Sequence, residues 1–236
     1  MAAKAPSHRQ FAGPVLQAAA GGELKVALRS YPRPTRSTDA LVNEPDLLDQ
    51  HLADYLAGAL HSRLVLVPPA QAQLVINLPH AGSAARGPAA PQGAMLALRG
   101  EARDELAGAE VCVGEGSPWQ AALQKEGARL KAYPSSLRAS VAFMGGECRF
   151  YADSRAALEG LLQLPEWRFY RLLPQRLDAS SDARVYLAGD DSASRDWVRD
   201  RLAQWRRDGG QAKAWAGHAD ELLSDSLKLA DGLVCH

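Results

Sequence analysis

The sequence predicts an α/β fold, because short β-rich runs alternate with helical segments along most of its 236 residues. The runs at residues 24–28 and 64–68 are separated by a segment with helical spacing, and a third run follows at 74–78. The same alternation continues to an amphipathic segment at 194–208, with no internal repeat. Alternation of this length is typical of largely parallel sheets.

The first predicted helix covers residues 44–60. Pro45 suits its first turn, since proline at the first helical position loses no hydrogen bond. The apolar residues that fall on one face of this helix are Leu48, Leu52, Tyr55, Leu56 and Leu60. After the strand at 74–78, the Gly-, Pro- and Ala-rich stretch 79–93 predicts a loop.

The second half of the chain repeats the pattern of strand and helix. Strands are expected at 94–99, 110–116, 130–134, 148–152, 167–173 and 183–189, and helices at 118–126, 135–146 and 154–164, with a connector at 100–108. The helix 194–208 has Ser194 as its expected N-cap and Gly209 with Gly210 as its end. Its buried stripe would consist of Trp197, Val198, Leu202 and Trp205.

The composition excludes two classes of protein. The 27 basic and 27 acidic residues balance, and no run of basic residues suggests nucleic-acid binding. No stretch reaches the roughly 18 apolar residues of a membrane span. The first 21 residues predict a disordered tail without the apolar core of a secretory signal. Either the protein is cytosolic, or it is a mature exported protein in which an initiator Met replaces the signal.

The segment "VCVGEGSPWQ", residues 111–120, leads from a strand through a glycine turn into a helix. Ser117 is placed to cap the helix that starts at Pro118. A helix N-terminus with free N–H groups and a hydroxyl can bind a carboxylate. The alternative is a serine that caps only its own helix, and the residues alone leave both open.

The order of these segments resembles the type 2 periplasmic substrate-binding proteins of ABC transporters, in their polar amino-acid branch. The quoted matches are "GGELKVALRSYPRP", "VCVGEGSPWQAAL" with "CRFYADSRAALEGLL", and "RVYLAGDDSASRDWVRDRLAQWRRDGG", together covering about residues 22–217. The resemblance implies two lobes joined by two crossing strands, with a solute cleft between them that closes by a hinge. Residues 22–96 and 187–236 would form lobe I, and residues 97–186 lobe II.

The resemblance also implies a set of ligand contacts. The turn with Ser117 would bind the carboxylate of a solute, and Tyr31 would cover it, with Arg29 or Arg33 supplying positive charge. Asp153 stands near the position of an acid that accepts the solute's ammonium group, and Trp119 is either a cleft wall or a lid on its helix. The alternative for the segment 29–34 is a surface loop held by two prolines.

Several residues depart from the family pattern. Only "PPAQAQ" lies between the second and third strands, so the first lobe is shortened. The loop that carries a ligand-binding arginine in the family offers only Arg86 here, and without a dependable bidentate arginine a carboxylate site loses its strongest element. Asp153 comes one residue early, and Arg149 replaces an acid usual near the start of that strand.

Two of the three cysteines are informative within this resemblance. Cys112 and Cys148 begin second-lobe strands that run close together in such a fold, which implies a disulfide and therefore an oxidising compartment, the periplasm. The alternative is two buried free thiols in a cytosolic core. Cys235 beside His236 is expected to be a frayed end, and no Cys/His spacing indicates a metal site.

The predicted function is a periplasmic, monomeric solute-binding protein that presents a small polar or anionic ligand to a membrane permease, without a cofactor. One alternative is an accessory protein whose degraded cleft docks another periplasmic protein. A less favoured one is a dehydratase-like enzyme, for which Glu115 with Asp153 is the only acid–base pair to offer. Hydrolase, nucleotide-binding and zinc motifs are absent from the sequence.

Overall fold

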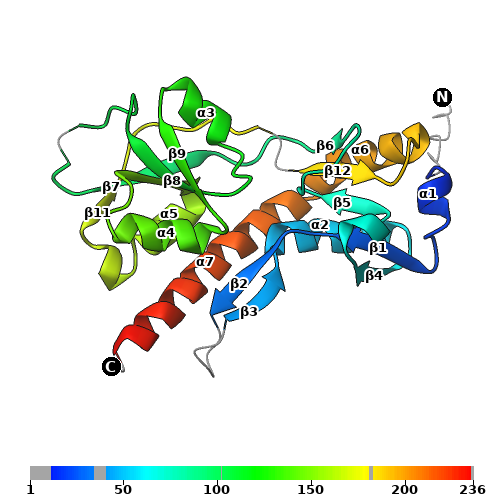
Figure 1. The fold of residues 1–236 in the computed structure, drawn as a ribbon, viewed down its shortest axis with the longest axis horizontal. Helices are drawn as coiled ribbons and strands as arrows, with labels where there is room; N and C mark the ends of the chain where they lie inside the picture. The colour runs from blue at the N-terminus through cyan, green and yellow to red at the C-terminus, as the bar shows by residue number, and fades with distance from the viewer. Residues whose placement is uncertain (1–11, 35–40, 102, 181–182, 235–236) are drawn as a thin grey trace, which may run out of the picture.

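Two five-stranded sheets and a two-stranded hairpin form the framework of the computed structural model, which describes residues 12–34, 41–101, 103–180 and 183–234. The sheets stand beside each other in Figure 1, and helices pack against both. The predicted α/β class is therefore confirmed. The sheets are mixed rather than largely parallel, because the strands next to the connections between them, β7, β11 and β12, are antiparallel to their neighbours.

The first sheet has the strand order β4-β1-β5-β12-β6. Its strands are β1 (Glu23–Ala27), β4 (Arg63–Leu66), β5 (Leu74–Ile76), β6 (Ala85–Arg86) and β12 (Arg184–Leu187). β1 pairs in parallel with β4 and β5, which the connections through α2 (Leu47–Ala59) and η1 (Pro69–Gln71) allow. β6 and the first residue of the later strand β7 (Gly93–Leu98) lie within the stretch predicted to be only loop, so that prediction is wrong for three residues.

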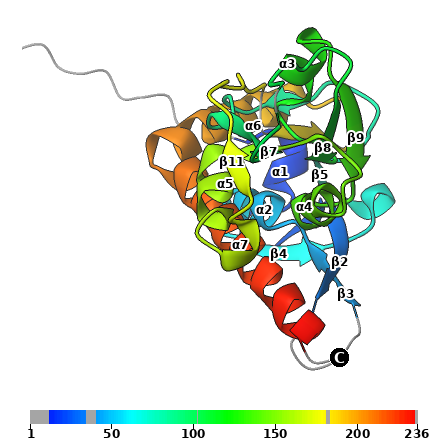
Figure 2. The ribbon, with the colours of Figure 1, turned by 90° about the vertical axis from the view of Figure 1, so that its left-hand side faces the viewer.

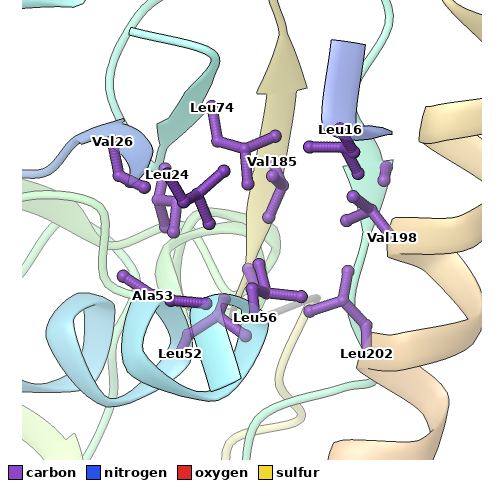
Figure 3. Packing of buried hydrophobic residues seen from close by; sticks show 14 of the residues in the cluster. Leu16, Leu24, Val26, Leu52, Ala53, Leu56, Leu74, Val185, Val198 and Leu202 are labelled. Atoms are coloured by element: carbon purple, nitrogen blue, oxygen red, sulfur yellow. The ribbon is translucent and has the colours of Figure 1, made fainter. Parts of the chain in front are cut away.

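A single apolar core fixes the helices of this lobe on the sheet. Figure 3 shows Leu24, Leu74 and Val185 of the strands above the side chains of α2 and beside those of α6 (Ser192–Arg207). The side chains that meet them from the two helices are Leu52, Ala53, Leu56, Val198 and Leu202. Both predicted amphipathic stripes therefore face the core.

The second sheet has the order β11-β7-β10-β8-β9. Its strands are β7 (Gly93–Leu98), β8 (Glu110–Gly114), β9 (Arg129–Tyr133), β10 (Phe150–Ser154) and β11 (Tyr170–Leu172). Its helices are α3 (Gln120–Lys125), α4 (Ser136–Met144), α5 (Arg155–Leu161) and the short η2 (Pro165–Trp167). Ser135 and Ser154 cap α4 and α5 by accepting hydrogen bonds from backbone N–H groups three residues on.

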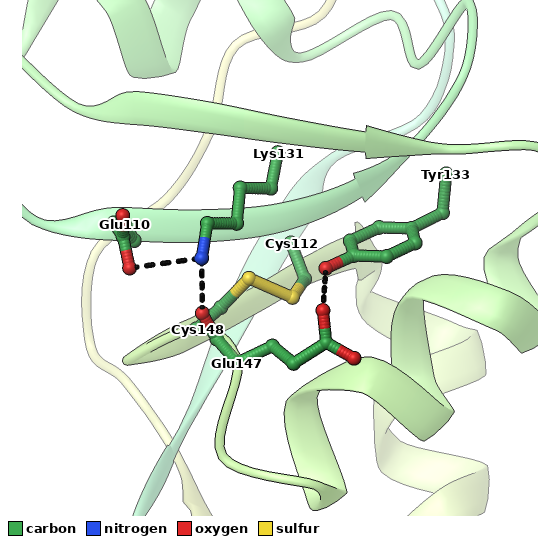
Figure 4. The surroundings of a disulfide bond; sticks show 6 residues. All are labelled: Glu110, Cys112, Lys131, Tyr133, Glu147 and Cys148. Carbon is green, nitrogen blue, oxygen red and sulfur yellow. Dashed lines mark hydrogen bonds and ion pairs between the residues drawn. A yellow bond between two sulfur atoms is a disulfide. The ribbon is translucent and has the colours of Figure 1, made fainter.

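The expected disulfide is present between Cys112 and Cys148, whose Cα atoms are 5.6 Å apart. Both residues are buried in the apolar cluster under α4. Figure 4 shows Lys131 and Tyr133 of β9 beside the bond, both bound to Glu147: the Lys131 ammonium donates to its carbonyl at 2.7 Å and the Tyr133 hydroxyl to its carboxylate at 2.8 Å. These contacts tie the chain around Cys148 to the neighbouring strand.

The predicted disordered tail of residues 1–21 is wrong from residue 12 onward; residues 1–11 lie outside the described part. Residues 14–17 form α1 (Pro14–Gln17), and Leu16 is fully buried in the core of the first lobe. Asp191 accepts a hydrogen bond from Val15 N at 2.9 Å, which fixes α1 to the start of α6. Local composition predicts disorder here because those partners lie about 180 residues away in the sequence.

Two predicted helix starts are also corrected. Asp191, not Ser194, is the N-cap of α6, and Ser194 lies inside the helix with its N–H bound to Asp191. Asp46 caps α2 through Asp49 N, and Pro45 ends a strand. In both cases an aspartate, one residue after Pro45 or three before Ser194, accepts a hydrogen bond from a free N–H group of the first turn.

The segment "RSYPRP" is not a free surface loop. Residues 30–34 form β2 (Ser30–Pro34), which pairs antiparallel with β3 (Leu41–Pro45). The prolines are tolerated because each strand of this hairpin has only one neighbour in the described residues. The hairpin projects from the first lobe toward the C-terminal helix (Figure 1).

The C-terminal helix α7 (Gly210–Val234) is the largest feature missing from the sequence prediction, which ended the helical structure at Gly209. α7 contacts α2, α6 and β2 on one side and α4 and α5 on the other. Figures 1 and 2 show it crossing the molecule diagonally, between the hairpin and α5, from the end of α6 to the C-terminus. α7 therefore contacts helices that pack on each of the two sheets.

The division into lobe I (22–96 and 187–236) and lobe II (97–186) stays a prediction. All of β7 belongs to the second sheet and all of β12 to the first. The sheets would therefore place the two segments that pass between the lobes slightly earlier, at residues 87–92 and 173–183. α7 belongs to neither lobe alone, because its side chains enter the apolar clusters of both.

Candidate functional site

A cavity of about 60 Å³ lies where the two lobes meet. Its walls come from the base of the β2–β3 hairpin, the first turn of α2, the turn after β8, the start of α4, the end of β10 and the middle of α7. Five of the six predicted ligand contacts line it: Arg29, Tyr31, Ser117, Trp119 and Asp153. Arg86 does not, because it lies on β6 and pairs with Arg184 of β12.

The turn after β8 places Ser117 in the wall of this cavity. The Ser117 side-chain oxygen is buried and has no hydrogen-bond partner among the described residues. It is not a helix cap, since α3 starts at Gln120 with Trp119 as its N-cap residue. The capping prediction is thus wrong, and the reason is one irregular turn, in which the Ser117 carbonyl accepts from Gln120 N, between the serine and the helix.

Arg29 joins the two lobes on one side of the cavity. Its guanidinium donates two hydrogen bonds to the Asp49 carboxylate, at 2.8 and 3.1 Å, and one to the Glu115 carbonyl in the second lobe, at 2.9 Å. Asp46 lies 3.4 Å away. Burial raises the pKa of Asp49 to about 6, against the opposite effect of Arg29. Most of this arginine's donors are therefore occupied within the chain.

The backbone at Gly116 has φ +72° and lies against Arg29. A Cβ atom at this position would stand 2.8 Å from an Arg29 nitrogen. Glycine is therefore required for both the left-handed conformation and the approach of the guanidinium.

Asp153 is buried, with 2% of its surface exposed, at the end of β10. Its carboxylate is 3.0 Å from His218 Nε2 of α7 and 3.0 Å from the Tyr151 hydroxyl, and it accepts from the Ser154 N–H. Burial alone would raise the pKa of Asp153, but the His218 charge and hydrogen bonds from His218, the Ser136 side chain and the Ser154 N–H lower it below 3.8. Burial would lower the pKa of His218, but Asp153 raises it above 6.5. Each group thus favours the charged form of the other.

Trp119 is a buried wall of the cavity rather than an exposed lid. Its indole N–H donates to the Pro91 carbonyl at 3.1 Å, and its ring centre is 5.4 Å from that of Trp215 in α7. A Cβ atom on Gly93 would collide with the Trp119 ring at 2.5 Å, so glycine makes room for it at the start of β7.

Tyr31 lies near the base of the hairpin, and Arg33 lies near the end of β2 and contacts α7. Burial and the nearby Asp46 carboxylate raise the pKa of Tyr31 above its ordinary 10. Arg33, two residues further along the same strand, forms ion pairs with Glu44, Glu221 and Asp225 at 2.8, 2.5 and 3.0 Å. Arg33 thus binds α7 through its ion pairs and does not line the cavity.

Trp215 and His218 are among the cavity residues that the sequence analysis missed. A signal for them exists in the sequence. The buried positions of the first half of α7 repeat with helical spacing, at Gln211, Ala214, Trp215, His218, Leu222 and Asp225. Because this stripe carries polar and charged members, a purely apolar search passes over it.

Neither a metal site nor a membrane span is found. Within the described residues, no three or more His, Cys, Asp or Glu side chains are grouped so that they hold a metal ion. No helix in the same part of the chain is long and apolar enough to cross a bilayer.

No protein-family model matches the chain, and no curated protein is similar in sequence. Solved structures are similar in fold. One is the amino acid ABC transporter substrate-binding protein AbpA of Streptococcus pneumoniae bound to L-arginine, with 13% identity, 86% of this chain and 96% of that chain covered, and a TM-score of 0.53.

Two further structures have the same fold. The Neisseria gonorrhoeae solute receptor for L-cysteine is 13% identical, over 86% of this chain and 91% of that chain, with a TM-score of 0.53. The ancestral amino acid-binding protein AncCDT-1, a precursor of cyclohexadienyl dehydratase, is 15% identical, over 86% and 98%, also at 0.53. The expected two-lobed type 2 binding-protein fold is therefore confirmed.

Proposed function

We propose that this chain is a solute-binding protein that holds a small polar solute between its lobes and delivers it to an ABC-type permease. The cavity at the lobe junction carries this proposal, because it collects Arg29, Tyr31, Ser117, Trp119 and Asp153 from segments far apart in the sequence. The buried Ser117 hydroxyl without a partner supports it further. Buried polar groups are nearly always hydrogen-bonded, so this one is suited to a bound solute or water.

The charges around the cavity favour a neutral polar solute over an anion. Arg29 and His218 face three acids that line the same space, Asp46, Glu115 and Asp153. A carboxylate would approach an Arg29 already bound to Asp49 and would also meet Asp46. At about 60 Å³ the cavity holds a few water molecules, which matches a solute of only a few heavy atoms.

The disulfide supports the periplasm as the place where this binding occurs. A bond between Cys112 and Cys148 forms and persists in an oxidising compartment and is rare in the cytosol. The similar structures include binding proteins of amino acid ABC transporters, which supports the permease as a partner.

Binding is favoured over catalysis by the state of the acids. The pair offered for an enzyme was Glu115 with Asp153, and the lowered pKa of Asp153 makes it a poor general acid near neutral pH. Glu221, whose pKa burial raises to about 7, is not a cavity residue. The pair offered for the dehydratase alternative therefore lacks a suitable acid in Asp153.

The test is calorimetric titration with acetamide and acetate, which have nearly the same shape but differ in charge. The wild type should bind acetamide more tightly than acetate. Ser117→Ala should weaken binding by roughly 2- to 13-fold, the loss of one ordinary hydrogen bond. Ser226→Ala is the matched control, because it removes another buried, unpartnered hydroxyl that does not line the cavity. Equal affinities for Ser117→Ala and wild type would remove Ser117 from the site.

A second function, an accessory protein that docks another protein, is favoured by one observation: α7 occupies much of the junction between the lobes. If neither probe nor any amino acid binds to the folded, oxidised wild type, this second proposal replaces the first.

A further inference from the structure

α7 is held in the junction by contacts with both lobes. Near its start, the Gln211 amide donates to the Ala89 carbonyl at 2.9 Å, in the segment that connects the sheets. Ala214 packs into the core of the first lobe, whereas Trp215 and Leu222 pack into the two clusters of the second. A helix anchored in this way fixes how far apart the lobes stand.

His218, in the middle of α7, balances the charge of Asp153 in the second lobe. Asp153 is a buried carboxylate whose other partners, the Tyr151 hydroxyl and the Ser154 N–H, are neutral. A buried carboxylate needs a cation close by, and here that cation is His218 of α7. Without His218, a carboxylate that demands a cation would line the cavity.

Trp215 occupies the adjoining space. Its ring packs at 5.4 Å from Trp119 and at 5.3 Å from the His218 ring of the same helix. Both α7 side chains line the cavity. The small volume of the cavity is therefore set in part by these two side chains of α7, and not only by the walls that the two lobes supply.

We propose that α7 is an intramolecular occupant of the cleft: His218 takes the carboxylate of Asp153, and Trp215 the adjoining space, that a larger solute with an ammonium group would use. The chain as folded then selects against amino acids. This inference rests on the proposed function in that the cavity is taken as the solute site.

The experiment is a gain of binding. Wild type, Trp215→Ala, His218→Gln and the double variant are titrated with L-arginine, L-lysine, L-glutamine and L-cysteine. His218→Gln removes the charge but retains a group that can donate to Asp153. We expect no binding by the wild type and at least a tenfold gain by the double variant for one or more of these amino acids.

Two controls separate occupancy from general loosening. Leu227→Ala changes an exposed side chain of the same helix, 43% accessible, and should leave the wild-type result unchanged. Adding Asp153→Asn to the double variant should abolish the gained binding, which a merely loosened protein would not show. Near-ultraviolet circular dichroism checks folding, and if the double variant is unfolded, Trp215→Phe and His218→Gln singly decide.

Two outcomes overturn the inference: amino-acid binding by the wild type as tight as by the variants, or folded variants that gain nothing. The proposed function is tested separately by acetamide and acetate. If these bind and no variant gains amino acids, the occupant inference fails and the solute site stands. If only the variants bind any solute, the occupant inference stands and the proposed function of the wild type fails.

Discussion

Replacing His218 with alanine should cost about 3–5 kcal/mol of unfolding free energy at about pH 6, the range for removing one partner of a buried ion pair. The structure supports the full range, because Asp153 is 2% exposed and keeps only neutral partners once His218 is lost. The 3.0 Å contact is direct, so no other side chain replaces the lost charge without moving.

The cost should depend on pH with a defined sign. The pKa of His218 is raised on folding, so its contribution is fully present below 6.5 and is lost as pH rises through the raised value. The pKa of Asp153 is lowered, so its contribution is present above 3.8 and is lost as pH falls through the lowered value. The pair thus stabilises most strongly between these two limits.

Urea unfolding at about pH 6 and about pH 9 measures this difference, with His218→Ala, Asp153→Asn and the double variant forming a mutant cycle. We expect a smaller His218→Ala penalty at the higher pH, and a double-variant penalty well below the sum of the single ones at the lower pH. A penalty that is the same at both pH values, or one that is additive in the cycle, would refute the charged pair.

Three further changes test the framework around the site. Removing the disulfide by Cys112→Ala with Cys148→Ala should lower the unfolding free energy by about 4 kcal/mol on the chain-entropy model, since the bond spans 36 positions; urea unfolding of the oxidised wild type is the comparison, and an unchanged midpoint would contradict the constraint. Leu222→Ala, at a residue 3% exposed, should cost roughly 2–5 kcal/mol by the same assay, and a cost below about 1 kcal/mol would mean that α7 is not packed on the second lobe. Gly116→Ala should cost at least about 1–2 kcal/mol of unfolding free energy from its positive φ alone. It should also displace Arg29 and so abolish acetamide binding. Gly58→Ala, in open space on α2, is the control and should leave binding unchanged.

The sheets could be predicted from the sequence because most of their strands are short apolar runs bounded by turns. Burial on both faces produces this pattern, as in β5 and β10, where every residue is buried. The two cysteines could be paired only through the family resemblance. Their pairing depends on the parallel register of β8 and β10, which places Tyr151 beside Cys112 and brings the chain before β10 close to β8.

The errors occur where a residue's partner is distant in the sequence. Leu16 is buried because Asp191 and Ser194 bind the backbone beside it, so the N-terminal segment is ordered against its own composition. Ser194 has the residue type of a cap, but Asp191 comes first and accepts its N–H. In the same way, Gly209 does end α6, but the chain resumes as α7 at the next residue.

The same cause limits what the sequence says of the site. Arg29 and Asp153 line one cavity, and each would be a strong solute contact if its charge were free. Their charges are instead matched inside the chain, by Asp49 in α2 and by His218 in α7. A charged residue in a cleft binds solute only to the extent that its own partners leave it unsatisfied. Pairing, rather than the presence of the residues, therefore decides whether this two-lobed fold accepts an amino acid, and α7 supplies the part of that pairing on the Asp153 side.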